Sequence, residues 1–428
     1  MVAPEAHQLA AAIWRIEAPK LIAVLVRLLR SVELAEEIAQ DTFVEALDRW
    51  GVSGTPDRPG AWLMTAAKHR ALDALRHMRR VEREHEQVVR ELEASVSAGI
   101  EESLDDIVGD DLLRLVFIAC HPVLPSDARV ALTLRLLGGL TTDEIARAFL
   151  VPEPTIAQRI TRAKRTLVDK AIAFELPLPG DLTARLESVL EVVYLVFNEG
   201  YLATAGDDWM RPGLCQDALR LGRFLAELLP EQSEVHALSA LLQLQASRAR
   251  ARSGPNGEAV LLLDQDRGKW DVVLIRRGLE ALARAEALAG ERPGTYLLQA
   301  AIAGCHASAQ RAEDTDWRRV VAIYETLAHV QPSPIVELNR AVAASMAFGP
   351  EAALAIVEPL LADPALVDYP FLPSVRADFL AKLGRHAEAQ AEVERAAELT
   401  KNAQERRLLL ARAAAYARAQ TASRGRTT

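Results

Sequence analysis

The chain has 428 residues and a formal net charge of −9; half of its residues are hydrophobic and 5% are aromatic. This length predicts about two or three domains, and the abundance of Ala and Leu with few aromatic residues favours an all-α fold over a β-sandwich or barrel. The acidic balance excludes a generally basic nucleic-acid coat, so any contact with DNA must be local. The three cysteines lie far apart, which excludes a disulfide framework and predicts a cytoplasmic protein. The apolar run at 21–29 contains Arg27 and is too short to span a membrane.

The segment 33–50 is the first with a strong pattern, because its apolar residues recur with the spacing of an amphipathic helix. Its other face is acidic. That face is compatible with simple solvation, and it would also complement a basic partner helix. The face carries Glu36, Glu37, Gln40, Asp41, Glu45 and Asp48.

A turn-rich loop at 51–60 precedes a second predicted helix at 61–80, which packs Leu63 and Leu72 inward and presents a basic surface. Cations beside an aromatic ring and a loop suit single-stranded DNA, because they track the backbone while the ring or loop receives an unstacked base. A tryptophan at a helix start is also a common core anchor, so Trp62 has two interpretations. The candidate residues are Trp62, Lys68, His69, Arg70, Arg76, Arg79 and Arg80.

The segment 84–110 is rich in Glu and Asp and shows little apolar periodicity in its middle, which predicts an acidic linker. We then predict a helix-turn-helix at Thr141–Leu167. Thr141 and Glu144 have the spacing of a capping box, and Pro154 suits the first turn of the second helix. That helix packs its apolar residues inward and turns a basic face outward, which suits the major groove of DNA. The apolar residues are Ile156, Ile160, Ala163 and Leu167, and the candidate DNA contacts are Thr155, Gln158, Arg159, Arg162, Lys164 and Arg165.

The remainder of the chain, 180–428, is predicted to be a helical extension that begins after the proline and glycine residues at 177–180. A helix, a glycine turn and a helix occur twice, with Gly349 and Gly384 35 residues apart, a period close to that of tetratricopeptide (TPR) repeats. Simple packing of Ala-rich hairpins explains the same pattern. The segments 194–203 and 261–271 are expected to be less regular. Their residues Asn198, Glu199, Asp264, Asp266 and Arg267 suit either a polar ligand site or ordinary helix ends and salt bridges.

Motifs for catalysis, phosphate binding and zinc hydrolases are absent from the sequence. The adjacent pairs Cys120–His121 and Cys305–His306 have no CxxC partner, so they predict core cysteines and not a zinc site. We therefore expect a binding protein with no catalytic residue, no metal and no cofactor.

The order of these parts resembles the extracytoplasmic-function (ECF) group of RNA polymerase sigma factors. The resemblance rests on AEEIAQDTFVEALDRW at 35–50, PGAWLMTAAKHRALDALRHMRR at 59–80 and the helix-turn-helix, with a charged linker between the last two, and it spans about 13–172. The long extension resembles the ECF subgroup with a TPR-like C-terminal domain. The implied domains are a sigma region 2-like domain at 8–83, the linker at 84–110, a sigma region 4-like domain at 111–172 and the extension at 180–428.

The resemblance implies binding to core RNA polymerase, through its β′ clamp helices and β flap, and to promoter DNA. The helix-turn-helix would read the −35 element, and the loop and helix at 51–80 would capture the −10 strand. The polymerase-binding positions would be Glu36, Gln40, Asp41, Phe43 and Leu47. From the stacked helical pairs of the extension, and not from the resemblance, we further predict that the extension modulates this activity through contact within the chain or through polymerase, and that it offers a surface for a regulatory protein. Two alternatives stay open: a stand-alone helix-turn-helix regulator with a helical sensor domain, and a helical scaffold that does not bind DNA.

Overall fold

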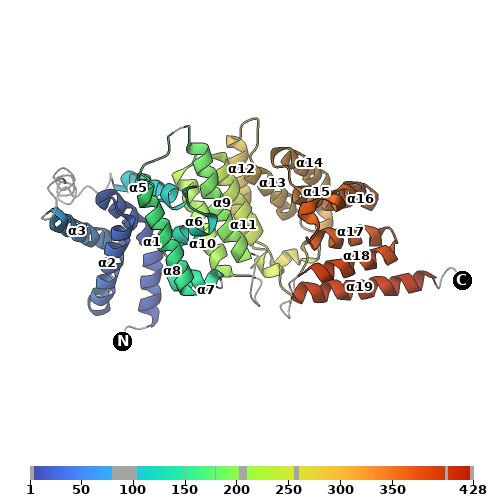
Figure 1. The fold of residues 1–428 in the computed structure, drawn as a ribbon, viewed down its shortest axis with the longest axis horizontal. Helices are drawn as coiled ribbons and strands as arrows, with labels where there is room; N and C mark the ends of the chain where they lie inside the picture. Colours follow the sequence, from blue (N-terminus) through green and yellow to red (C-terminus); the bar gives the residue numbers. More distant parts are fainter. Residues whose placement is uncertain are drawn as a thin grey trace. The chain divides into compact units, whose positions relative to one another are not determined.

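The computed structural model describes residues 4–79, 104–149, 151–178, 180–201, 210–254, 260–400 and 403–424, and these residues form helices without β-strands (Figure 1). The all-α prediction is therefore confirmed for this part of the chain. Contacts divide the chain into two compact units, Met1–Leu229 and Pro230–Thr428. The first unit contains α1 (Pro4–Leu29), α2 (Val32–Ser53), α3 (Pro59–Arg79), α5 (Leu104–Ala119), α6 (Ser126–Leu136), α7 (Thr142–Phe149), α8 (Glu153–Asp169), α9 (Leu182–Tyr201) and α10 (Pro212–Leu228).

Helices α1 to α3 pack on one another and form what we call the N-terminal bundle. The Ser31 hydroxyl caps α2 by accepting a hydrogen bond from the Leu34 amide at 3.2 Å. Apolar residues of α2 and α3, such as Ala39 and Leu63, are buried at the predicted helical spacing, and Leu25 of α1, for which no helix was predicted, is buried with them. The two helices predicted at 33–50 and 61–80 are thus present as α2 and α3.

Helices α5 to α8 form a second group, the HTH bundle, around the buried α6. The predicted capping box of α7 is confirmed. The Thr141 amide donates to Glu144 Oε2 at 2.8 Å, and the Glu144 amide donates to Thr141 Oγ1 at 3.1 Å. Pro154 lies in the first turn of α8. Helix α5 begins at Leu104, within the segment predicted as a linker, and residues 84–103 of that segment lie outside the described residues.

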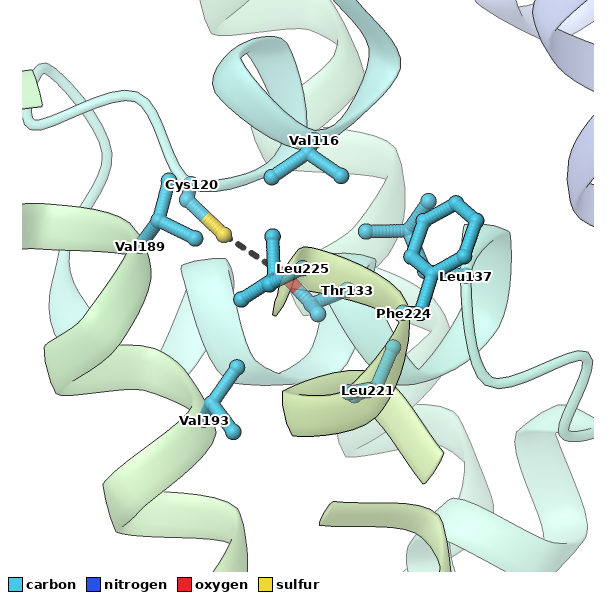
Figure 2. Close-up of a pocket in the computed structure, with 9 residues that line it drawn as sticks. All are labelled: Val116, Cys120, Thr133, Leu137, Val189, Val193, Leu221, Phe224 and Leu225. Carbon is cyan, nitrogen blue, oxygen red and sulfur yellow. Dashed lines mark hydrogen bonds between the residues drawn. The ribbon is translucent and has the colours of Figure 1, made fainter. Parts of the chain in front are cut away.

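Helices α9 and α10 pack against each other and against the HTH bundle, so their apolar residues continue its core. Figure 2 shows a small cavity where the helices meet, in which the Cys120 Sγ and Thr133 Oγ1 atoms are hydrogen-bonded at 3.2 Å. Burial raises the pKa of the Cys120 thiol to about 11, as expected for a core cysteine. The contacts therefore do not divide at 177–180, where we expected a new domain to begin. The cavity is lined by Val116, Cys120, Thr133, Leu137, Val189, Val193, Leu221, Phe224 and Leu225.

Helix α9 also differs from the sequence analysis, because it continues without interruption through most of the segment 194–203 that was expected to be irregular. Val193, Val196 and Phe197 are buried on its inner face. Gly200 lies so close to α10 that a Cβ atom there would be 2.6 Å from the Cys215 amide nitrogen. The glycine therefore permits close helix packing and does not end the helix.

The second unit consists of helical hairpins. Its elements are α11 (Ser233–Ala246), η1 (Ala249–Ala251), η2 (Leu262–Asp264), η3 (Arg267–Lys269), α12 (Val272–Leu288), α13 (Thr295–Ser308), η4 (Ala312–Asp314), α14 (Trp317–Val330), α15 (Pro334–Phe348), α16 (Pro350–Val357), η5 (Glu358–Ala362), η6 (Pro364–Leu366), α17 (Phe371–Lys382), α18 (His386–Leu399) and α19 (Ala403–Arg424). Gly349 separates α15 from α16, and Gly384 separates α17 from α18. Both have positive φ angles, +97° and +75°, so the predicted glycine turns are confirmed.

The predicted irregular segment 261–271 is confirmed as short 3-10 turns before α12. Asp266, Arg267 and Asp271 of this segment serve the local fold. Asp266 accepts a hydrogen bond from the Gly268 amide at 2.9 Å, and Asp271 accepts from two amides in the first turn of α12. Arg267 lies over the buried Trp270, with 4.8 Å from its guanidinium carbon to the ring centroid, and donates to the Ala309 carbonyl at 2.8 Å. These contacts match the helix-end interpretation of the segment.

Candidate nucleic-acid interface

The outer face of α8 is the best-defined candidate for a nucleic-acid contact. Ile156, Ile160, Ala163 and Leu167 are buried, as predicted, which fixes the rotation of the helix about its axis. Three of the six candidate residues, Gln158, Arg162 and Arg165, are exposed on the opposite side. They present an amide and two guanidinium groups, the donors that bind base edges and phosphates in the major groove. Helix α7, fixed by its capping box, precedes this helix as in a helix-turn-helix.

The other three α8 candidates are less accessible. Thr155 is half-buried near the start of the helix. Arg159 makes a 3.0 Å ion pair with Asp127 of α6. Lys164 makes an ion pair with Glu36 of the N-terminal bundle. DNA contacts by Arg159 and Lys164 thus require that these ion pairs be broken or shared.

The candidates on α3 also divide by exposure. His69 and Arg76 are exposed, whereas Arg70 is half-buried and donates to Glu45 of α2 at 2.8 Å. Lys68 is 8% exposed, and burial lowers the pKa of its ammonium group, which the nearby charge of Arg27 lowers further. Lys68 therefore lies beneath the basic surface that the exposed residues of α3 form. The side chains of Arg79 and Arg80 lie outside the described residues.

Trp62 is half-buried at the start of α3, at the edge of the basic surface. Its ring meets that of Trp50 edge-on, with the centroids 5.7 Å apart. The guanidinium carbon of Arg49 lies 5.7 Å from the centroid of the same ring. Trp62 therefore anchors α3 to the end of α2, as in the core-anchor interpretation, and remains partly exposed.

The five candidates for polymerase contact lie on α2. Asp41 is exposed, whereas Gln40 and Leu47 are half-buried. The Phe43 ring is tilted against Trp14 of α1 at a centroid distance of 4.6 Å, so it also packs within the bundle. Gln40 donates to Glu36 Oε1 at 2.9 Å.

Glu36 differs from the rest of the acidic face, because it is 6% exposed and makes ion pairs with both Arg135 of α6 and Lys164 of α8. Burial alone would raise the pKa of its carboxyl group. The two adjacent cations outweigh that effect and hold the pKa of Glu36 below its ordinary value. Of the acidic face, Glu36 is thus paired with α6 and α8 of the same chain, whereas Glu37, Asp41 and Asp48 remain exposed.

Arg211, the residue before α10, and Arg220 of α10 contact the HTH bundle on either side of α7, and sequence reasoning missed both. Arg211 donates to the Ala148 carbonyl in the last turn of α7. Arg220 donates to the Gly138 carbonyl at 2.7 Å, in the turn that precedes α7. An isolated arginine on an amphipathic helix normally indicates solvent exposure, so the sequence carried no signal for these contacts.

The described residues contain no group of three His, Cys, Asp or Glu side chains arranged to hold a metal ion. Within the same residues, no helix is long and apolar enough to cross a lipid bilayer.

Comparison with protein families gives three matches along the chain. Residues 13–81 match sigma-70 region 2, which covers most of the N-terminal bundle, and residues 114–167 match sigma-70 region 4, which covers α6 to α8 and part of α5. Residues 185–286 match a family of unknown function, DUF6596. That match begins in α9 and ends in α12, so it extends across both compact units.

Comparison with individual proteins gives relatives over the whole chain and over its first part. An uncharacterized protein of Rhizobium meliloti is 43% identical over 90% of this chain and 91% of its own length. The RNA polymerase sigma-H factor of Pseudomonas aeruginosa is 30% identical over 36% of this chain and 80% of its own length. The ECF RNA polymerase sigma factor SigK of Mycobacterium ulcerans is 27% identical over 35% of this chain and 78% of its own length. No solved structure was found to match the chain.

Proposed function

The chain belongs to the ECF-type sigma factors of the sigma-70 family, in a form with a long C-terminal extension, and we propose that it directs core RNA polymerase to promoters by reading a −35 element with α8 and a −10 element with α3. The observation that carries this proposal is the exposed face of α8 in a chain that also has a region 2 bundle. In this role the chain binds and positions, the polymerase makes the bonds, and both act in the cytoplasm.

The −35 contact is assigned first to the exposed residues Gln158, Arg162 and Arg165. An exposed arginine reads guanine through two parallel hydrogen bonds, and glutamine reads adenine in the same way. Arg159 and Lys164 are held in ion pairs with Asp127 and Glu36. We therefore assign them to contacts that form later, when DNA phosphates replace these carboxylates as their partners.

The −10 contact is assigned to the surface around Trp62, His69 and Arg76, with the exposed part of the tryptophan ring available to an unstacked base. The contact with core polymerase is assigned to the exposed acidic residues of α2. One of these is Asp41, which the sequence analysis named as a polymerase-binding position. Both assignments rest on exposure and charge, together with the region 2 match.

In vitro transcription with bacterial core polymerase tests this function. Genomic fragments that bind the reconstituted holoenzyme would serve as templates, and transcript starts would be mapped. We expect specific initiation without another sigma factor, and we expect Arg162→Glu to abolish it while holoenzyme assembly is retained. Arg395→Glu, an exposed change on α18 of the second unit, is the control and should leave initiation intact.

A stand-alone helix-turn-helix regulator would give a different result in the same assay. Such a protein would bind duplex DNA but would not assemble with core polymerase, and it would start no transcript by itself. Failure of the purified chain to bind core polymerase at low salt would therefore overturn the proposed function in favour of the regulator.

The extension is proposed to modulate the sigma factor through α9 and α10, and the rest of it offers a surface for a regulatory protein. The support is contact within the first unit, because α9 and α10 share the core of the HTH bundle, Arg211 contacts the last turn of α7, and Arg220 contacts the turn before α7. Removal of all residues after 172 would expose this core, so any change in activity would combine a loss of stability with a loss of regulation. Substitutions in the full chain distinguish the effect on stability from the effect on regulation.

A further inference from the structure

The N-terminal bundle and the HTH bundle are joined by polar contacts at three places. Arg27 of α1 pairs with the fully buried Asp111 of α5 at 2.7 Å. Glu36 of α2 pairs with Arg135 and Lys164, and Arg15 of α1 pairs with Glu144 of α7 at 3.0 Å. In this arrangement Lys164 is engaged by Glu36, and Glu36 is enclosed between the bundles.

Arg220 of α10 contacts both bundles at once. Its guanidinium group donates to the Arg15 carbonyl of α1 at 2.9 Å and to the Gly138 carbonyl of the HTH bundle at 2.7 Å. A weaker contact of 3.4 Å reaches the Leu137 carbonyl. The carboxyl group of Asp217 lies 3.5 Å from the same guanidinium group. One side chain of the extension thus connects α1 to the turn that begins the helix-turn-helix.

The backbone at this junction is also tightly fitted. Gly139 follows in the same turn with a φ angle of +68°, and a Cβ atom there would lie 3.2 Å from the Arg15 Cα atom. The glycine satisfies both requirements, since it adopts the left-handed conformation and lets α1 approach the turn closely. The Arg220 contacts therefore fasten a junction that is already closely packed.

We propose that Arg220 is a latch by which the extension holds region 2 and region 4 together in the free protein, with Lys164 and Glu36 withheld from DNA and polymerase until the bundles separate. This inference rests on the proposed function, because the closed state matters only if both bundles must engage a promoter complex. The latch also implies that the extension inhibits the sigma factor, because it favours the closed arrangement of the two bundles, which is inactive.

In the closed state, Glu36 and Lys164 bind each other, so polymerase and DNA must compete with this ion pair for the two residues. A polymerase or promoter that needs Glu36 or Lys164 must first break their ion pair, so its apparent affinity falls by the fraction of protein that is open. Weakening the latch raises that fraction without changing any residue that touches DNA. The expected effect is a gain of binding, which a merely destabilised protein would not show.

The test compares Arg220→Met with Arg223→Met in the full chain. Arg223 lies on the same helix, is exposed, and donates to the Leu219 carbonyl of its own helix at 3.3 Å, so it is a matched control. Spin labels at Asp48 of α2 and Thr161 of α8, both exposed, would report the separation of the bundles. Replacing Cys305 by Ala leaves the buried Cys120 and Cys215 as the remaining thiols.

We expect Arg220→Met to add a population with longer label distances and to raise the affinity of the free protein for a −35 duplex by about three- to tenfold, the factor that corresponds to losing one or two hydrogen bonds. Arg223→Met should change neither. Label distances and DNA affinity in Arg220→Met that equal those of the control would overturn the latch.

A second variant guards against loss of folding in Arg220→Met. Arg15→Ala removes an exposed side chain and its Glu144 ion pair but leaves the backbone carbonyl that Arg220 contacts, so it should open the bundles to a smaller extent. Unchanged distances in this variant would also count against the closed state. Transcription with core polymerase distinguishes failure of the latch from failure of the proposed function. If the protein initiates transcription but the label distances do not change in the variants, only the latch is rejected. If the wild-type protein does not initiate transcription, the proposed function itself is rejected.

Discussion

Replacement of Leu225 by Ala tests whether α10 is a structural part of the HTH bundle. Leu225 is 1% exposed and lines the cavity that α10 shares with α5, α6 and α9 (Figure 2). A buried Leu→Ala change costs about 2–5 kcal/mol, and the cost increases with the cavity that remains. The new space adjoins an existing void, so we expect a loss of about 3 kcal/mol in the free energy of unfolding of the first unit.

Hydrogen exchange resolved by peptide is the appropriate assay, because it reports the stability of α6 and α10 separately. A loss of about 3 kcal/mol corresponds to roughly a hundredfold faster exchange, and we expect this acceleration in α6 as well as in α10. Leu178→Ala is the matched control, since this leucine is 73% exposed and should have almost no effect. Faster exchange confined to α9 and α10, with wild-type rates in α6, would refute the idea that they share one core.

The remaining predictions concern DNA affinity, pH and packing. Arg162→Gln should reduce the salt dependence of DNA binding by about one unit of log–log slope if the arginine contacts a phosphate, and a salt titration that shows an unaltered slope and affinity would remove it from the interface. Burial, with the charges of Arg248 and Arg267, lowers the pKa of His306 to about 4; the unfolded chain therefore binds the proton more tightly between pH 4 and 6.5, and the second unit should lose about 2 kcal/mol between pH 7.5 and 5. His306→Phe should flatten this part of the stability profile in urea titrations. Gly278→Ala should destabilise the α11–α12 hairpin by about 1–3 kcal/mol, because the added Cβ would lie 2.7 Å from Leu244 Cγ, whereas Gly213→Ala meets open space and should be neutral in thermal unfolding.

The helix-turn-helix was predictable because its signals are local. The capping box of Thr141 and Glu144, the position of Pro154 and the apolar spacing of α8 all lie within one short segment, and the structure confirms each of them. The same is true of α2 and α3. Periodicity and capping report which face of a helix is apolar, and burial follows from that face.

The ion pairs at the candidate site were not predictable, because they depend on residues far apart in sequence. Glu36 lies 99 residues from Arg135 and 128 from Lys164, and nothing in its own helix indicates burial. Charged residues are normally solvated, so the default interpretation placed Glu36 and Lys164 on free surfaces. Arg220 was missed for the same reason, since its partners lie in two other segments.

The segment 194–203 shows the opposite error, in which local signals misled. Asn198 and Gly200 have low helix propensity, which is consistent with the irregular piece that was expected. In the structure, tertiary packing overrides that propensity, because Gly200 allows α9 to lie against α10. The glycine there reflects a close approach between two helices, which only the assembled fold reveals.

The shared core of α5, α6, α9 and α10 has a consequence for synthesis on the ribosome. In a nascent chain that ends before α10, the apolar residues of region 4 that α10 normally covers are exposed to solvent. Such a surface favours aggregation or degradation over folding. Completion of this domain must wait until about residue 228 has left the exit tunnel. Prematurely terminated products that contain both promoter-binding segments are then expected to be cleared before they compete with the finished protein for polymerase.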